Sequence, residues 1–102
     1  MRVEYGRFER MRSEAEDAVA QALHDAQAGK GGHSERQLAF ILRELRLMQA
    51  AMRDKTPFHP YYPRGICDDW QRYDPLGEKL MDLVDLYSKL KIQEKEHKHD
   101  CI

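Results

Sequence analysis

The sequence predicts an all-α fold, an antiparallel bundle of three main helices with one irregular crossover. Three observations predict it. Apolar residues recur at three- and four-residue steps in three separate stretches of the 102-residue chain. Glycines or capping residues separate these stretches, and a segment rich in proline and aromatic residues lies between the second and the third. A chain of this length is sufficient for one domain, and we assign it to residues 1–92.

The first helix is expected over about residues 4–28. Glycines at positions 29, 31 and 32 follow it, and glycine readily adopts the left-handed conformation that ends many helices. Because most residues of its apolar stripe are alanines, a neighbouring helix can approach closely. The stripe consists of Phe8, Met11, Ala15, Ala18, Val19, Ala22 and Ala26.

The second helix is expected from Ser34 to about residue 53, because Ser34 and Gln37 have the spacing of a capping box. Phe40 and Leu47 are seven residues apart on a separate face of this helix. Either another helix covers that face, or it is a second candidate surface for a partner. The core stripe is the most regular in the chain: Leu38, Ile41, Leu42, Leu45, Met48 and Met52.

Residues 54–73 interrupt the helical pattern. Prolines recur at positions 57, 60 and 63, and each proline favours an extended conformation in the residue before it. Aromatic residues lie between the prolines. We therefore expect a rigid crossover that packs on the bundle through its aromatic side chains, with room for one extra short helix over residues 64–72 that positions Trp70 in the core.

The last main helix is expected over residues 75–92, because Asp74-Pro75 combines a favourable N-cap with proline at the first helical position. Asp82 and Asp85 lie off its apolar stripe and are expected to face solvent. Residues 93–102 are charged and lack an apolar period, so we expect a disordered tail. The core stripe consists of Leu76, Leu80, Leu83, Val84, Tyr87 and Leu90.

Composition argues against several classes of function. The formal net charge is −1, whereas nucleic-acid-binding proteins usually carry a marked basic excess. No apolar run approaches the roughly 20 residues that a membrane span requires. Met1–Tyr5 has no apolar signal region, and two cysteines are too few for a disulfide scaffold. We expect a cytoplasmic protein with neither a nucleic-acid nor a membrane partner.

The sequence contains no strong catalytic or metal-binding pattern. His97, His99 and Cys101 alternate in the tail without the second ligand pair that a structural zinc site needs, so we expect no metal and no cofactor. Cys67 precedes two carboxylates, which disfavour the thiolate form of a nucleophile, and it is interpreted as a small buried thiol. The glycines near residue 30 lack the spacing of a phosphate-binding loop. We expect no enzymatic activity and assign no catalytic residue.

Acidic residues concentrate in residues 68–85, which carry six acids and two bases, a net charge of −4. Residues 1–67 carry 11 bases and 9 acids, a net charge of +2. An acidic surface attracts basic partners, and aromatic and arginine residues dominate interface energetics. The alternative is a solvated helix face that keeps the protein soluble. The candidate partner-binding residues are Tyr61, Tyr62, Arg64, Asp68, Asp69, Arg72, Tyr73, Glu78, Asp82 and Asp85.

Several short motifs resemble a known family. The chain reads Ser-Glu-Arg-Gln-Leu-Ala-Phe-Ile over residues 34–41, followed by Gly65-Ile66, by Trp-Gln-Arg-Tyr-Asp-Pro-Leu over residues 70–76, and by Leu80 and Tyr87. This pattern, which covers about residues 15–90, resembles small helical immunity proteins of type VI secretion effectors, specifically those that neutralise NAD(P)+ glycohydrolase toxins. The segment 58–63 departs from the family pattern. The resemblance implies an antitoxin that binds a cognate toxin domain and occludes its active site.

A second class of function fits the same residues. A helical adaptor module would bind a protein other than a toxin, through the same kind of acidic and aromatic surface. The two hypotheses differ in whether a toxin gene lies beside this one. The sequence leaves the oligomeric state and the identity of the toxin open.

Overall fold

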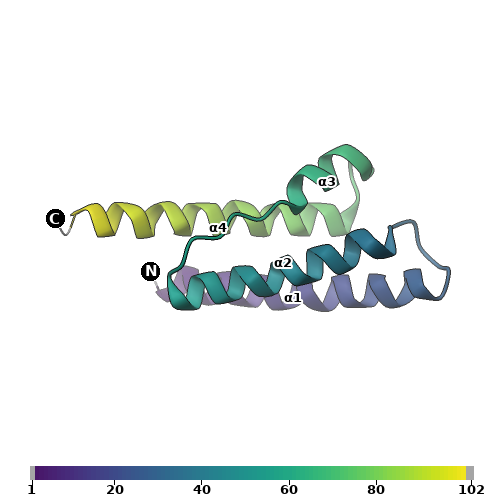
Figure 1. The fold of residues 1–102 in the computed structure, drawn as a ribbon, viewed down its shortest axis with the longest axis horizontal. Coiled ribbons are helices and arrows are strands. Elements are labelled where there is room, and N and C mark those ends of the chain that lie inside the picture. The colour runs from purple at the N-terminus through teal and green to yellow at the C-terminus, as the bar shows by residue number, and fades with distance from the viewer. Residues whose placement is uncertain (1, 101–102) are drawn as a thin grey trace.

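The computed structural model describes the backbone of residues 2–100 and the side chains of residues 4–93. The described backbone forms α1 (Arg2–Gln27), α2 (Glu35–Asp54), α3 (Tyr62–Asp69) and α4 (Pro75–Asp100). The chain runs along α1, returns along α2, runs forward again through a non-helical segment to α3, and returns along α4 (Figure 1). This arrangement confirms the predicted all-α bundle with one extra short helix.

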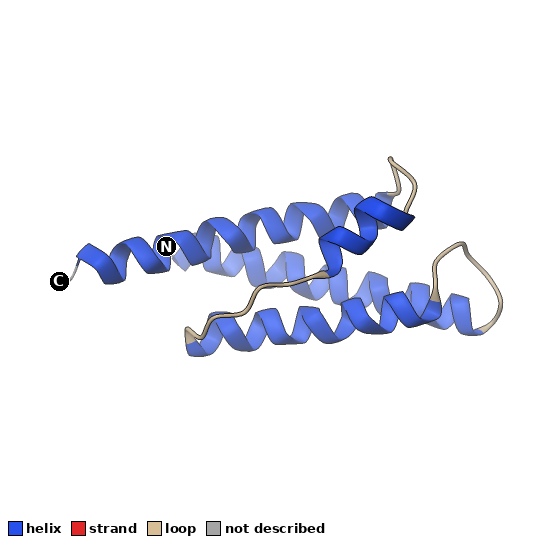
Figure 2. Ribbon diagram, turned by 45° about the horizontal axis from the view of Figure 1, so that its top comes forward, coloured by secondary structure: helices blue, strands red, loops and turns tan. Residues whose placement is uncertain are grey.

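The three long helices enclose the hydrophobic core. α1 makes the main contacts with both α2 and α4, whereas the short α3 packs at one end of the bundle against α2 and α4 (Figure 2). The predicted stripes supply the core, although six of their members are only half-buried: Met11, Ala18, Ala22, Ala26, Leu42 and Leu76. The completely buried side chains are Phe8, Ala15, Val19, Leu38, Ile41, Leu45, Met48, Leu80 and Leu83.

Both predicted N-caps are confirmed. The Ser34 hydroxyl accepts a hydrogen bond from the Gln37 N–H at 3.3 Å, which satisfies a backbone donor in the first turn of α2. The Asp74 carboxylate accepts hydrogen bonds from the N–H groups of Leu76 and Gly77 at 2.9 and 3.1 Å. These caps fix where α2 and α4 begin.

The bounds of α3, which ends at Asp69 rather than residue 72, and of α4 differ most from the prediction. α3 begins at Tyr62 rather than residue 64, because Pro63 lies in its first turn, where a missing N–H leaves no bond unmade. α4 continues to Asp100, beyond residue 92, so the backbone of the expected disordered tail is helical as far as it is described. The apolar stripe ends near Leu90, but the glutamate, lysine and glutamine residues that follow are good helix formers.

The crossover, residues 55–61, connects α2 to α3 without helix or strand (Figure 2); Lys55 at its start is in the left-handed conformation, and Tyr61 at its end is the N-cap of α3. A segment outside helices and sheets has no regular partners for its backbone groups, so side chains must supply them. Glu44 of α2 does so: its carboxylate accepts hydrogen bonds from the Tyr61 N–H at 2.9 Å and from the Tyr62 N–H at 2.7 Å. Glu44 itself is only 3% exposed.

Side chains of α4 hold the other side of the crossover. The Tyr87 hydroxyl donates a hydrogen bond to the Phe58 carbonyl at 2.7 Å. The Lys91 ammonium donates to the carbonyls of Ala51 and Thr56, each at 2.9 Å. The crossover is therefore bonded to both α2 and α4, and it sets the position of α3.

Candidate functional site

The structure does not bring the predicted binding residues together on one surface. Arg72, Glu78 and Asp82 line a groove, Tyr61 lies on a second surface, against the middle of α2, and Tyr62 is in the core. The other five are exposed but do not line the groove: Arg64, Asp68, Asp69, Tyr73 and Asp85. Tyr62 is 2% exposed, and its hydroxyl donates a hydrogen bond to the Leu80 carbonyl at 2.7 Å. Burial raises the pKa of Tyr62, and the nearby Glu44 carboxylate adds to this effect. Tyr62 is therefore a core residue, which corrects its placement on the binding surface.

The acidic groove lies between α3 and the first turns of α4. Ile66 is almost completely buried at its floor, and Trp70 and Met81 are half-buried beside it. Arg72, Glu78 and Asp82 are exposed at its edges. The groove is lined by Ile66, Cys67, Trp70, Gln71, Arg72, Asp74, Gly77, Glu78, Met81 and Asp82.

Gly77 allows Trp70 to pack against α4. A Cβ atom at Gly77 would lie 3.2 Å from Cε3 of Trp70 and 3.4 Å from Cγ2 of Ile66. The absence of a side chain therefore permits the close approach that forms the groove floor. Trp70 packs against the core but is only half-buried, so its prediction as a core residue is confirmed in part.

A polar network holds Trp70 in this position. Its indole Nε1 donates a hydrogen bond to Gln37 Oε1 at 2.7 Å, and the Gln37 amide donates to Asp69 at 3.3 Å. The His33 ring lies 4.3 Å from the Trp70 ring, and His33 Nε2 is 2.7 Å from Asp74 Oδ2. The network joins the loop after α1, the first turn of α2, the end of α3 and the start of α4, so it fixes the shape of the groove.

Asp74 is stabilised in its charged form within this network. Burial alone would raise its pKa, but hydrogen bonds from the Gly77 N–H and from His33 outweigh that effect and lower it. Asp74 is thus occupied by its own helix cap and by His33. It contributes negative potential to the groove without being free to pair with a partner.

The remaining carboxylates face solvent. Asp82 and Asp85 are exposed, which confirms the expectation for both, and Asp68 and Glu78 are exposed as well. Among the described side chains, no cationic group lies within ion-pairing distance of these four carboxylates. Their charge is therefore available to an approaching partner. Arg64, Arg72 and Tyr73 are also exposed, Tyr73 at 78%.

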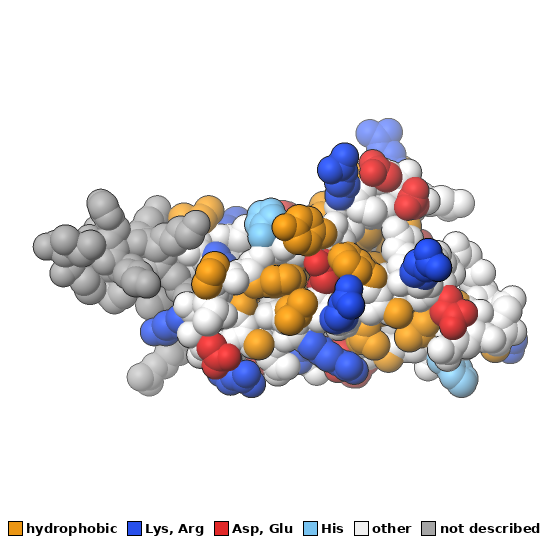
Figure 3. Space-filling view, viewed as in Figure 1, with side chains coloured by type: hydrophobic (Ala, Val, Ile, Leu, Met, Phe, Trp, Pro, Cys, Tyr) orange, Lys and Arg blue, Asp and Glu red, His pale blue; other side chains and the backbone are white. Residues whose placement is uncertain are grey.

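The second surface, which we call the aromatic patch, consists of Phe40, Arg43, Leu47, His59 and Tyr61. Tyr61 is 69% exposed and Leu47 is 44% exposed, whereas Phe40 is half-buried against the core. The Arg43 guanidinium lies 5.5 Å from the Phe40 ring centroid, and His59 packs edge-on against Tyr61 at 6.3 Å. Hydrophobic side chains gather on the face formed by α2 and the crossover, beside Lys and Arg side chains (Figure 3).

Glu44 connects the two parts of the aromatic patch, the residues of α2 and the residues of the crossover. Phe40 and Leu47 are one turn before and one turn after Glu44 on α2, and Glu44 binds the Tyr61 backbone between them. The structure thus places Tyr61 with the second candidate face, apart from the acidic residues with which the sequence grouped it. The question left open for this face has two answers: Leu47 is 44% exposed, whereas Phe40 is half-buried against the core.

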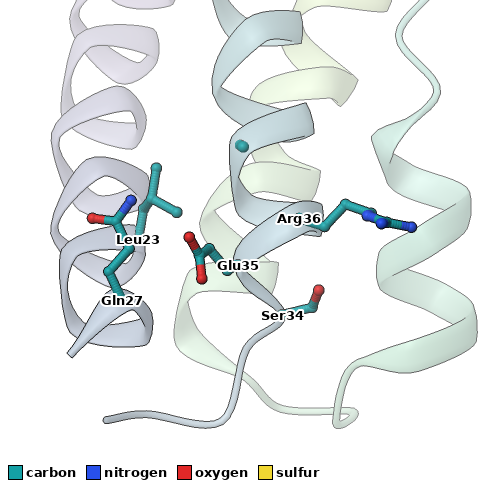
Figure 4. Close-up of a pocket in the computed structure, with 6 residues that line it drawn as sticks. Leu23, Gln27, Ser34, Glu35 and Arg36 are labelled. Atoms are coloured by element: carbon teal, nitrogen blue, oxygen red, sulfur yellow. The ribbon is translucent and has the colours of Figure 1, made fainter. Parts of the chain in front are cut away.

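A further depression lies between the end of α1 and the start of α2 (Figure 4). Leu23 and Glu35 point toward each other across it, whereas Arg36 points away toward α3. It contains none of the predicted binding residues. Its lining brings together no set of like charges or aromatic side chains, so it offers less to a partner than the two surfaces above.

The described side chains contain no group of three residues able to hold a metal ion. His97, His99 and Cys101 lie outside the described side chains. Cys67 is exposed, which corrects the expectation of a buried thiol: α3 is short and turns only Tyr62 and Ile66 inward. In the part of the chain that the structure describes, no helix is both long and apolar enough to cross a membrane.

Two buried charged residues were missed from the sequence, Glu44 and Arg12. Arg12 donates hydrogen bonds to Glu9 at 2.8 Å and to Glu16 at 2.6 Å, and the bond with Glu9 in particular raises its pKa. A usable signal was present. Each residue falls in the middle of an apolar stripe, Arg12 between Phe8 and Ala15, and a charge at such a position requires polar partners.

Comparisons with protein-family models, with curated proteins and with solved structures found no match to this chain. Function must therefore be inferred from the chemistry of the acidic groove and of the aromatic patch.

Proposed function

We propose that the chain is an immunity (antitoxin) protein that binds and occludes the active site of a cognate secreted antibacterial toxin, an NAD(P)+-degrading effector. The observation that carries the proposal is the acidic groove. It combines an apolar floor, including Trp70, with exposed carboxylates such as Glu78 and Asp82. The resemblance of residues 34–41 and 70–76 to the immunity family supplies the identity of the partner.

The charge of the groove suits this partner. A cleft that binds a phosphate-bearing cofactor is usually basic, because arginine and lysine side chains neutralise phosphate. Exposed carboxylates accelerate association with such a cleft and orient the encounter. In the complex, the apolar floor would be buried against the toxin, and the charged residues at its edge would exclude water from this contact.

The rigidity of the groove also favours occlusion. A binding surface that is already ordered loses less conformational entropy on association than a flexible one. Trp70 is fixed by its hydrogen bond to Gln37, and Asp74 is fixed by the first turn of α4 and by His33. The proposal needs no catalytic step, metal or cofactor from this chain, and it places both proteins in the cytoplasm of the protected cell.

The test is the charge reversal Asp82→Lys with Asp85→Lys, measured against the toxin domain encoded beside the gene. The matched control is Glu14→Lys with Asp17→Lys, since these acids are also exposed and three residues apart, but on α1. The first variant reverses one charge at the edge of the groove (Asp82) and one exposed charge on the same helix (Asp85), so it should associate about tenfold more slowly at low salt and lose protection of a host that expresses the toxin. The control should behave as wild type, because exposed substitutions usually change stability little.

Equal association rates for the two variants would show that the acidic groove does not bind the toxin. Absence of a toxin gene beside this one, with no protection against any NAD(P)+-degrading domain tested, would favour the adaptor hypothesis. The aromatic patch is the observation that favours an adaptor, because aromatic and arginine side chains are enriched where proteins bind one another.

A further inference from the structure

The acidic groove leaves the aromatic patch without a role. Tyr61 and Leu47 are both exposed. The backbone of Tyr61 is fixed in this position because its N–H donates a hydrogen bond to Glu44. The patch combines a tyrosine and an arginine, which are residue types enriched in binding hot spots, and the arginine lies over the phenylalanine ring. A single exposed leucine needs no explanation, but a fixed group of this composition does.

The charge around the patch selects its partner. The exposed charged residues of α2 are four arginines, Arg36, Arg43, Arg46 and Arg53, together with one acid at each end of the helix, Glu35 and Asp54. Glu44, in the middle of the helix, is buried and bonded to backbone N–H groups. Arg53 is paired with Asp54, and Arg46 lies 3.9 Å from Glu16. Arg36 and Arg43 have no carboxylate within ion-pairing distance among the described side chains.

We propose that the aromatic patch docks an acidic segment of a partner protein. Apolar side chains of that segment would lie on Phe40, Leu47 and Tyr61, and its carboxylates would pair with Arg36 and Arg43. Arginine suits this role because its planar guanidinium can bind a carboxylate through two hydrogen bonds. The inference is independent of the proposed function, because the patch and the acidic groove share no residue.

Two other occupants fit the patch less well. A second copy joined through a two-fold axis would bring the arginines of both α2 helices together, which is a like-charge contact. A membrane surface would require a broad apolar face, whereas Phe40 is half-buried and α2 places its main apolar stripe in the core. An acidic protein segment satisfies both the arginines and the small apolar area.

The test is selection of binders to the full chain from a displayed random peptide library. The selected peptides should be enriched in aspartate and glutamate beside leucine or aromatic residues. Arg43→Glu should weaken their binding about tenfold, since it replaces an attraction with a repulsion. Arg10→Glu is the matched control, because Arg10 is exposed on α1, and it should bind the peptides as wild type does. Circular dichroism should show the same helix content for both variants.

Three outcomes would overturn the proposal. The first is a set of selected peptides without acidic enrichment, or peptides that bind the Arg43→Glu variant as tightly as wild type. The second is sedimentation showing dimers of the free chain that Tyr61→Ala dissociates, because the patch would then belong to a second copy. The third is binding to anionic phosphatidylserine vesicles that Arg43→Glu abolishes, because the patch would then be a membrane contact.

Discussion

The bundle core and the crossover are held together by different physical forces. Between α1, α2 and α4, completely buried side chains such as Ile41, Leu45 and Leu83 stabilise the interface through removal of apolar surface from water. At the crossover, side chains of α2 and α4 form hydrogen bonds to backbone groups of residues 56, 58, 61 and 62. The stability of the core depends on the total apolar area that is buried, whereas the crossover depends on a few individual hydrogen bonds.

The difference determines where function can be placed. Helix interfaces tolerate substitution of one apolar residue by another of similar volume, because their stability is the sum of many weak contacts. The crossover depends on a few side chains, and these also fix Tyr61 on the aromatic patch and α3 beside the acidic groove. Both candidate binding surfaces are therefore set by polar bonds that make only a modest net contribution to stability.

The largest effect is expected from a charge placed in the core. Leu45→Asp buries a carboxylate at a completely buried position, which costs several kcal/mol in a domain stable by about 5–15 kcal/mol. We expect loss of helical circular dichroism at 25 °C. Leu47→Asp, two residues away on the same helix but 44% exposed, should remain folded. Equal unfolding of both variants would contradict the assignment of the two faces of α2.

The next effect concerns Glu44. Glu44→Leu introduces a side chain of similar size that has no hydrogen-bond acceptor. The buried Tyr62 N–H then loses its partner, so the free energy of unfolding should fall by about 1–3 kcal/mol. Glu44→Gln retains one carbonyl oxygen and should lose less. Urea unfolding of the three proteins measures the order. A leucine variant as stable as wild type would show that the crossover does not depend on this carboxylate.

A smaller effect is expected from the buried tyrosine hydroxyls. Tyr62→Phe and Tyr87→Phe each remove one hydrogen bond to a backbone carbonyl, and each should lower the free energy of unfolding by about 0.5–1.5 kcal/mol. Tyr73→Phe is the control, because Tyr73 is 78% exposed. Its unfolding should match wild type, and an equal loss in all three variants would indicate a cause other than these two hydrogen bonds.

The smallest effect appears only in acid. The folded chain lowers the pKa of Asp74 below that of the unfolded chain, about 3.9, so its carboxylate stabilises the fold above that pH. This contribution is lost as the pH falls through the lowered pKa. Asp74→Asn keeps a good N-cap but cannot titrate, so its stability should fall less steeply below about pH 4. If the free energy of unfolding fell equally steeply with decreasing pH in wild type and variant, the role given to Asp74 would be contradicted.

The sequence predicted the bundle core well because helix periodicity and capping are local signals. The Ser34 and Asp74 caps and the stripes of α2 and α4 needed only neighbouring residues. The crossover was not predictable in this way. Whether Glu44 faces solvent or Tyr62 depends on a segment 17 or 18 residues later in the chain, and the side on which Tyr61 emerges depends on the same contact.

The candidate site was predicted in part for the same reason. Local charge density located the acidic residues, and Asp82 and Asp85 are exposed as their positions beside the stripe indicated. The groove floor required Gly77 to admit Trp70 and required His33 to reach Asp74 across 41 residues, and neither contact has a local sequence signal. Cys67 was misplaced because the orientation of a single short helix is set by packing.

The most direct test of the role of the crossover is native-state hydrogen exchange at the Tyr61 and Tyr62 amides. In wild type, both should exchange slowly, because each donates a hydrogen bond to Glu44. In Glu44→Leu, both should exchange much faster, while core amides such as those of Leu45 and Leu83 change only with global stability. Unchanged protection of Tyr61 and Tyr62 in that variant would contradict the claim that Glu44 positions the crossover and, with it, both binding surfaces.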